Sequence, residues 1–359
     1  MAAFFILSTI VIWGLFAATG LWLLTFFPVL GKFSPAGWAP ILCTVFVLAG
    51  LTLTRTHYNI FTSVLYYAAY ILFGLAFIAF CVTAAGAVIF LLFKMLHISA
   101  RAYLGIISVG VTAVLFSCAL WGGFSAPKLK RIPLQIPGFP PLKIALISDA
   151  HLGMGVSYSR WDRALTRLEN EKPDLVLVLG DVFEYGPHAG KYAARLAAFK
   201  TPLGTYGVTG NHEYYVGYEN SRDFFRQAEI KLLENETTLL PTGVQLAGLK
   251  DIRTARVTPQ DLTNILATAD KQKPLILLSH TPLYAEQAAE SGVNLMLSGH
   301  THGGQIWPFN YLVKLQFPRV YGLFDVNDMK FYITSGMFYW GIPLRLFAPA
   351  ELPVLEVNL

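Results

Sequence analysis

The 359-residue chain changes character once along its length. No aspartate or glutamate precedes Asp149, so all 22 acidic residues lie in the later part, and residues 1–124 contain only four lysines and arginines. Long apolar sequence with few charges suits the interior of a bilayer, so this asymmetry predicts a membrane region followed by a water-soluble region. We place the membrane region at 1–124, a proline-rich linker at 125–142 and the soluble domain at 143–359.

Four apolar runs predict about four transmembrane helices. A bilayer crossing takes about 20 apolar residues, and the runs lie at 3–27, 38–54, within 60–93 and at 103–123. A signal peptide is the alternative for the first run, but no basic segment precedes it and three further runs follow. The third run exceeds one span, so we expect its first turns at the membrane interface, which suits three tyrosines: Tyr66, Tyr67 and Tyr70.

The sparse charges bound both function and orientation. Ionisable groups inside spans usually mark transport pathways, and none lies mid-span here, which favours an anchor over a transporter. With four spans both ends share one side, and that side carries one more basic residue than the other. The positive-inside tendency therefore favours a multi-pass protein of the plasma (inner) membrane with a cytoplasmic catalytic domain. Residues 125–359 carry 23 basic and 22 acidic residues, so no nucleic-acid partner is expected.

Strand-like and helical patterns alternate in the soluble region. Short apolar runs rich in leucine and β-branched residues each end in a polar cluster, and amphipathic segments separate them. Continuous apolar runs suit strands buried on both faces, so we expect an α/β sheet with helices on both sides and a ligand site beyond the carboxyl ends of the strands. The runs lie at 143–149, 174–181, 206–212, 274–280 and 293–300, with further strands expected at 331–336 and 352–359.

The polar clusters at these strand ends are candidate metal ligands. Each alone is typical of a turn, a helix cap or a surface histidine. Together they offer mixed oxygen and nitrogen ligands, which suit Mn, Fe or Zn better than Ca or Mg alone. The clusters contain Asp149 and His151, Asp181, Asn211 and His212, His280, and His300 and His302, with Gly180, Gly210 and Gly299 beside them to let the backbone turn sharply.

Seven potential ligands are too many for one tetrahedral ion, but they would fill two adjacent ions if one carboxylate bridges them. Two ions about 3.5–4 Å apart stabilise the attacking and leaving oxygens during displacement at phosphorus, and they lower the pKa of a bound water. The pattern therefore predicts a dinuclear centre that works on phosphorus.

The order D-x-H, G-D, G-N-H-E, H and G-H-T-H resembles the calcineurin-like metallophosphoesterases over residues 143–305, with a weaker match in the tail. The longer segments GNHEYY and GHTHGGQIWPF resemble the branch of that family with N-terminal membrane spans. The resemblance implies a four-layer α/β/β/α fold, in which two sheets lie between layers of helices.

The resemblance also implies roles for the polar residues. His212 would not bind metal; it would contact a phosphoryl oxygen or protonate the leaving group, as suits an imidazole that titrates near the working pH. One ion would be held by Asp149, His151 and His302, the other by Asn211, His280 and His300, with Asp181 bridging the two.

Three features depart from the family pattern or lie outside it. Glu184 stands where many members have aspartate, and we expect this change to be neutral because the position is not a ligand. The bulky residues at 337–339 either add an apolar wall to the site or pack in the core. Arg345 either binds a second phosphate of the substrate or pairs with Glu351.

The sequence thus predicts a membrane-anchored, two-metal hydrolase that cleaves a phosphomonoester, phosphodiester or pyrophosphate bond. The spans favour a phosphorylated, lipid-linked substrate at the bilayer surface, where Lys128, Lys130 and Arg131 would meet anionic headgroups. UDP-diacylglucosamine, whose pyrophosphate a similar type of enzyme splits, is the favoured substrate. The alternatives are a non-enzymatic, metal-dependent scaffold tethered to the membrane and a transporter with a regulatory domain.

Overall fold

The computed structural model describes residues 2–32, 38–53, 59–99, 101–184, 186 and 188–359. The chain divides into two compact units. The helical unit comprises Met1–Phe124 together with Gly341–Leu346, and the α/β unit comprises Ser125–Trp340 together with Phe347–Leu359. A short segment near the C-terminus thus belongs to the helical unit, and the membrane region expected at 1–124 stays a prediction.

Four helices make up most of the helical unit: α1 (Ala2–Phe26), α2 (Ala39–Leu53), α3 (Ile60–Met95) and α4 (Arg101–Phe124). Within the described ranges, α1, α3 and α4 are long and apolar enough to cross a membrane. Helix α2 has 15 residues, a length of about 22 Å, which is shorter than a hydrocarbon core of about 30 Å. Three of the four expected spans are thus found as long apolar helices, and a crossing by α2 stays a prediction.

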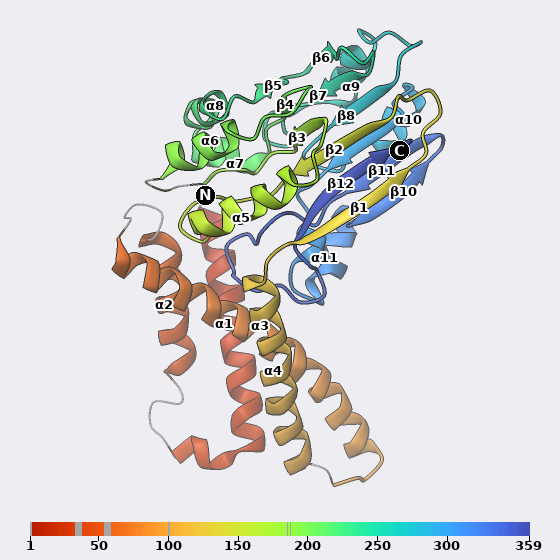
Figure 1. The fold of residues 1–359 in the computed structure, drawn as a ribbon. Coiled ribbons are helices and arrows are strands. Elements are labelled where there is room, and N and C mark those ends of the chain that lie inside the picture. Colours follow the sequence, from red (N-terminus) through yellow and green to blue (C-terminus); the bar gives the residue numbers. More distant parts are fainter. Residues whose placement is uncertain (1, 33–37, 54–58, 100, 185, 187) are drawn as a thin grey trace. The chain divides into compact units, whose positions relative to one another are not determined.

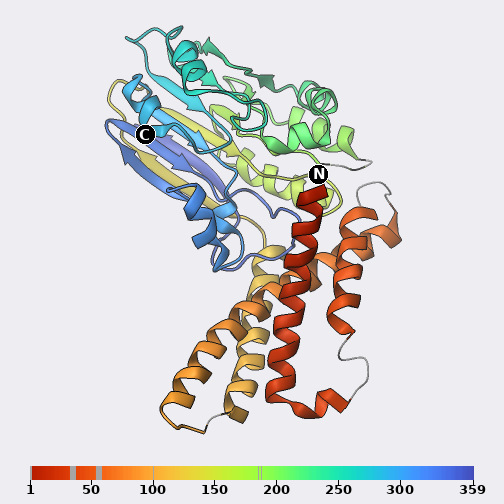
Figure 2. The ribbon, with the colours of Figure 1, turned by 180° about the vertical axis from the view of Figure 1, so that it is seen from behind.

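Local sequence explains where α3 begins. The side chain of Asn59 accepts a hydrogen bond from the Thr62 N–H, and the Thr62 hydroxyl accepts one from the Asn59 N–H, so each residue satisfies a backbone donor that the first turn leaves open. Helix α3 packs against α1, α2 and α4 and so holds the unit together, as both views of the ribbon show (Figures 1 and 2).

The segment Gly341–Leu346 packs closely on α3 and α4 through glycines. A β-carbon at Gly74 would overlap the side chain of Leu344, and one at Gly123 would overlap the Pro343 carbonyl. The Tyr66 hydroxyl donates to the Gly341 carbonyl at 2.9 Å. A tyrosine expected at the membrane interface is therefore also a partner of this segment.

The α/β unit contains two six-stranded sheets (Figure 1). The first sheet has the order β1 (Lys128–Leu134), β12 (Glu351–Val357), β2 (Leu142–Ile147), β3 (Leu175–Val178), β4 (Thr205–Gly207) and β5 (Lys231–Leu232). The second has the order β10 (Gly322–Val326), β11 (Met329–Ile333), β9 (Leu295–Ser298), β8 (Leu275–Leu278), β7 (Gln245–Gly248) and β6 (Glu236–Leu239). In the first sheet β12 is antiparallel to β2 and the other pairs are parallel; in the second, the pairs β10–β11 and β6–β7 are antiparallel and the rest are parallel.

Side chains alternate along each strand, which places the sheets face to face. In β2, Ile144 and Leu146 point into a core shared with Ile276 and Leu297 of the second sheet. Helices α5 (Tyr158–Glu169), α6 (Ala189–Ala197) and α8 (Tyr218–Gln227) cover the outer face of the first sheet, and α9 (Pro259–Leu266) and α10 (Ala285–Glu290) cover that of the second. The expected four-layer α/β/β/α arrangement is confirmed.

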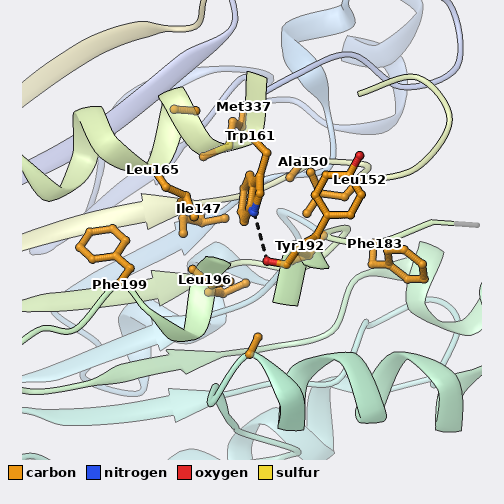
Figure 3. Close-up of a cluster of buried hydrophobic side chains, with 14 of the residues drawn as sticks. Ile147, Ala150, Leu152, Trp161, Leu165, Phe183, Tyr192, Leu196, Phe199 and Met337 are labelled. Atoms are coloured by element: carbon orange, nitrogen blue, oxygen red, sulfur yellow. Dashed lines mark hydrogen bonds between the residues drawn. The ribbon is translucent and has the colours of Figure 1, made fainter. Parts of the chain in front are cut away.

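The outer core of the first sheet decides the role of residues 337–339. Met337 lies in the cluster around Trp161, whose indole N–H donates to the Tyr192 carbonyl at 3.2 Å (Figure 3). Phe338 belongs to the same cluster, and the Tyr339 hydroxyl donates to the Gly155 carbonyl. All three side chains are buried. Of the two alternatives for this stretch, core packing is therefore the correct one.

Candidate metal centre

The strand ends bring the sequence-predicted residues together. Three strands of the first sheet lead into site residues: Asp149 and His151 follow β2, Asp181 follows β3, and Asn211 and His212 begin α7 (Asn211–Val216) after β4. Two strands of the second sheet do the same, since His280 follows β8, and His300 and His302 follow β9. Parallel strands end at a common edge, so the loops after them converge.

The first ligand group consists of Asp149, His151 and His302, whose ligand atoms lie within 4.8 Å of one another. The two imidazoles face each other with 3.0 Å between their Nε2 atoms, and His302 Nε2 lies 3.4 Å from Asp149 Oδ1. The backbone N–H of His300 donates to Asp149 Oδ1 at 3.0 Å. A loop of the second sheet thus orients a carboxylate of the first.

The second ligand group consists of Asp181, His280 and His300, also within 4.8 Å of one another. His280 Nδ1 lies 2.7 Å from the Leu179 carbonyl. Since a carbonyl only accepts, this Nδ1 carries a hydrogen, and Nε2 faces Asp181 Oδ2 at 3.1 Å and His300 Nδ1 at 3.2 Å. A backbone carbonyl that fixes the tautomer in this way is the usual support of a metal-binding histidine.

Asp181 belongs to two groups, because it also lies within 4.8 Å of His151 and His212. It is the only acidic residue shared between groups in the part of the chain that the structure describes. Asn211, which the sequence assigned to the same cation as His280 and His300, has a buried Oδ1 for which the structure shows no hydrogen-bond donor. A buried acceptor without a partner costs about 1–3 kcal/mol. An oxygen left open among histidines and carboxylates fits a cation ligand, so the residues present suit a metal centre.

The charges in the cluster also suit a bound cation. Burial lowers the pKa of His280, but the Asp181 and Asp149 carboxylates outweigh it and raise that pKa to about 10. Burial and the charged His280 together lower the pKa of His300 to about 4. The buried carboxylates thus favour a positive charge among them, and a metal ion would supply that charge directly.

The backbone at the site is strained. A positive φ is uncommon outside glycine and costs on the order of 1–3 kcal/mol, so it usually marks a functional site. Positive φ angles occur at five of the expected ligands: Asp149 (52°), His151 (42°), Asp181 (51°), His300 (71°) and His302 (50°). The glycines beside them play the expected part, since Gly180 has φ 89° and a β-carbon at Gly299 would overlap the Asp149 carboxylate.

Glu213, to which the sequence interpretation assigned no role, joins the loops after β3 and β4. Its buried carboxylate accepts hydrogen bonds from the backbone N–H groups of Asp181 (2.9 Å), Val182 (2.9 Å) and Gly210 (2.7 Å). This clamp sets the spacing between Asp181 and the Asn211–His212 pair. The only sequence signal was its place in the motif GNHE, directly after two expected site residues.

Glu184 also has a part that the sequence interpretation missed. Its Oε1 lies 2.7 Å from His151 Nδ1 and 3.1 Å from His212 Nδ1, so one carboxylate orients both a metal ligand and the expected catalytic imidazole. Burial disfavours its charge, but the hydrogen bonds from these histidines hold the pKa of Glu184 well below its usual range. Its carboxylate thus contacts two site residues, and the neutrality expected for glutamate at this position stays a prediction.

Two exposed aromatic rings flank His212. The Tyr215 ring lies 5.2 Å and the Trp340 ring 5.6 Å from the imidazole, both edge-on. The Gln305 amide fixes Trp340 by donating to its carbonyl at 3.0 Å and accepting from its N–H at 2.9 Å. About half of each aromatic residue remains exposed. Sequence reasoning found neither ring, although Gln305 stands in the motif GHTHGGQ.

The charged residues that the sequence assigned to the substrate or to lipid headgroups differ in their surroundings. Arg345 is buried in the helical unit, where its backbone N–H donates to the Ala119 carbonyl at 2.9 Å, and its role toward the substrate stays a prediction. Glu351 lies 3.4 Å from Lys130 Nζ. Arg131 forms a two-pronged ion pair with Glu171 at 2.7 and 2.8 Å. Two of the three cations expected to meet headgroups are therefore paired inside the α/β unit.

Comparison with known proteins agrees with this site. The family model for the calcineurin-like phosphoesterases matches residues 142–304. A protein of Campylobacter jejuni named as a metallophosphoesterase is 35% identical over 255 residues, which cover 69% of this chain and 68% of that protein. A metallophosphoesterase of Aquifex aeolicus is 33% identical over 230 residues, covering 62% of this chain and 88% of that one.

A relative of Bos taurus extends the likeness to a membrane protein. It is named as a transmembrane protein with a metallophosphoesterase domain, and it is 35% identical over 272 residues, covering 69% of this chain and 61% of that protein. The match thus spans about two thirds of the Campylobacter and Bos taurus proteins and 88% of the Aquifex protein.

Proposed function

Since this chain belongs to the calcineurin-like phosphoesterase family and is a metal-dependent phosphoesterase, we propose that it holds two divalent cations and hydrolyses a phosphoester or pyrophosphate bond of a lipid-linked substrate. The observation that carries the proposal is a set of three overlapping ligand groups: Asp181 shares one with His280 and His300 and another with His151 and His212, and His151 shares the third with Asp149 and His302. A carboxylate common to two groups suits a bridge between two adjacent ions, and one group alone would not.

We assign one cation to Asp149, His151 and His302, the other to Asn211, His280 and His300, and the bridge to Asp181. Mixed imidazole, carboxylate and amide ligands favour Mn, Fe or Zn. When bound, such a pair polarises the phosphoryl group and activates water as the nucleophile.

His212 is the catalytic residue of the proposal. Glu184 accepts a hydrogen bond from its Nδ1, which leaves Nε2 to serve the substrate. Burial lowers the pKa of His212, but the charges of Asp181 and Glu184 outweigh it and raise the pKa to about 9. The hydrogen bond to Glu184 favours the protonated imidazole, which can donate a hydrogen bond to a phosphoryl oxygen or a proton to the leaving oxygen.

The surroundings of His212 support the proposed substrate class. Tyr215 and Trp340 offer exposed aromatic surface next to His212, which suits an apolar or base-bearing group on the substrate. The chain also carries helices that are apolar enough to cross a membrane. We therefore favour a lipid-linked phosphate, with UDP-diacylglucosamine as the specific candidate.

The test uses the full chain purified in detergent and loaded with Mn²⁺, Fe²⁺ or Zn²⁺ in turn. Hydrolysis of UDP-diacylglucosamine, a phospholipid and bis(p-nitrophenyl) phosphate is measured beside the metal content. We expect at least one lipid substrate to be cleaved faster than the soluble diester. A protein that binds two metal ions and cleaves none of the three would overturn the proposal and favour the scaffold alternative.

A further inference from the structure

Helix α11 (Phe309–Gln316), which follows the GHTHGGQ loop, exposes large apolar side chains. None of its eight residues is buried. Leu315 is 85% exposed, Tyr311 61% and Leu312 57%, and Trp307 and Phe347 add exposed rings beside it. We define these five residues as the apolar patch.

A surface helix in water normally turns its apolar stripe toward the core and its polar side outward. Helix α11 does the reverse with its leucines, so hydration of the patch is unfavourable. Scattered exposed leucines are ordinary, but several large apolar side chains on one short helix mark an interaction site.

The patch rests on a rigid support next to the metal centre. A β-carbon at Gly304 would overlap the backbone of Asn310, so the helix lies tightly against the metal loop. Phe317, directly after the helix, is buried with its ring 5.2 Å from that of His300. The Thr301 hydroxyl donates to the Val320 carbonyl. A ligand on the patch would therefore be bound beside the catalytic loop.

The charges around the patch suit an anionic surface. Residues 299–324 contain no acidic residue. Lys314 is exposed on α11, and Arg319 forms an ion pair with Glu286 at 2.8 Å. Aromatic and leucine side chains together with a lysine are the composition of helices that lie in the bilayer interface.

The connections of the chain near the patch also favour a lipid surface as its partner. Trp307 and Phe347 lie with their ring centroids 6.1 Å apart, and Phe347 directly follows Gly341–Leu346, the segment that belongs to the helical unit. Only residues 125–127 separate α4 from β1, and three residues span about 10 Å at most. The polypeptide that carries the patch is thus joined by short connections to a unit whose helices suit a membrane.

We propose that α11 and the apolar patch insert into the headgroup region of the bilayer. The occupant is the lipid surface itself, and the helix lies in the interface plane with Leu312 and Leu315 toward the acyl chains. Docking of this helix brings the metal loop to lipids at the surface, so it adds a membrane-contact site to the α/β unit that the spans do not provide.

The direct test measures depth. Cys43, Cys81 and Cys118 are replaced by alanine in the full chain, Leu315→Cys is introduced, and a spin label there is compared with one at Arg226→Cys on α8 in nanodiscs of neutral and anionic phospholipid. We expect the label at 315 to be reached by oxygen and shielded from a water-soluble nickel relaxant, and the label at 226 to behave as in water. Equal exposure to the nickel reagent at both positions would overturn the proposal. Retained metal content verifies that each variant is folded.

A second test rests on the proposed function. Leu312→Glu with Leu315→Glu should slow cleavage of a bilayer-held lipid substrate by about tenfold or more, since charges oppose insertion. Cleavage of soluble bis(p-nitrophenyl) phosphate should stay unchanged. The matched control is Leu239→Glu, which alters an exposed leucine in β6. Equal losses on both substrates, or no loss on the lipid, would contradict the docking role. If no lipid is cleaved even by the unaltered chain, the proposed function fails, and the depth measurement still decides the docking proposal.

Discussion

Helix α3 of the helical unit and the sheets of the α/β unit bury different kinds of side chain. In α3 the buried positions are mostly small, such as Ala69, Gly74 and Gly86, while Phe61 and Leu91 are exposed. In the α/β unit large aliphatic side chains fill the interior, and the buried charged residues gather mainly at the strand ends. Small residues at helix contacts and large ones outside suit a lipid solvent. The comparison teaches that metal chemistry lies in one unit, whereas the other is built for close helix packing.

The largest test of this division removes the shared carboxylate. In Asp181→Asn the proposed bridge between the two cations is lost, so bound metal and hydrolysis should fall together. We expect kcat/KM to drop by more than the roughly 10- to 100-fold typical of residues that only orient ligands. Metal analysis and diester hydrolysis measure both. The control Asp325→Asn, an exposed carboxylate paired with Lys330, should change neither. Full activity in Asp181→Asn would refute the bridging role.

Substitution of His212 separates catalysis from metal binding inside the α/β unit. His212→Ala should retain its metal, because the residue is assigned to the substrate, and should lose about 10²- to 10⁴-fold in rate, the usual contribution of a general acid or base. Single-turnover hydrolysis and metal analysis test this together. Loss of metal in this variant would instead make His212 a ligand.

Glu184 should give a smaller effect with a signature in pH. Its charge is one cause of the raised pKa of His212, so Glu184→Gln should lower that pKa. The activity that requires a protonated His212 would then be lost at a lower pH than in the unaltered chain. We expect a loss of roughly 10- to 100-fold in kcat at neutral pH, and rescue of the profile by Glu184→Asp. An unchanged pH profile in Glu184→Gln would show that this carboxylate does not set the charge of His212.

The smallest effect is expected in the helical unit. Gly123→Ala places a methyl group against the Pro343 carbonyl, and overpacking of this kind costs about 1–3 kcal/mol. On the same helix Gly110 has open space around it, so Gly110→Ala is the matched control and should not destabilise. Thermal unfolding of the full chain in detergent compares the two. Lower metal content in Gly123→Ala would contradict the assignment of metal binding to the α/β unit alone.

Sequence reasoning found the residues of the site because parallel strands end at a common edge, which converts the order of five motifs into proximity. It did not find the roles of Glu184 and Glu213, because each carboxylate contacts residues in loops that are distant in sequence. Glu213 accepts hydrogen bonds from the backbone of Val182 and Gly210, and Glu184 contacts the His151 side chain. Trp340 escaped notice because the preceding stretch, residues 337–339, has no strand or helix period that would separate core from surface. The length of α2 was equally hidden, because hydropathy marks an apolar run without fixing the ends of its helix.

The close packing of Gly341–Leu346 on Gly74 and Gly123 has a practical consequence for any attempt to separate the α/β unit from the helical unit. A protease that cuts within residues 125–127 would sever one strand of polypeptide, yet Gly341–Leu346 would still tie the two fragments together. A shortened protein that begins at residue 125 would meet the converse difficulty. Leu344 and Leu346, now buried, would face water, and such a product should aggregate unless detergent or replacement of these leucines shields them.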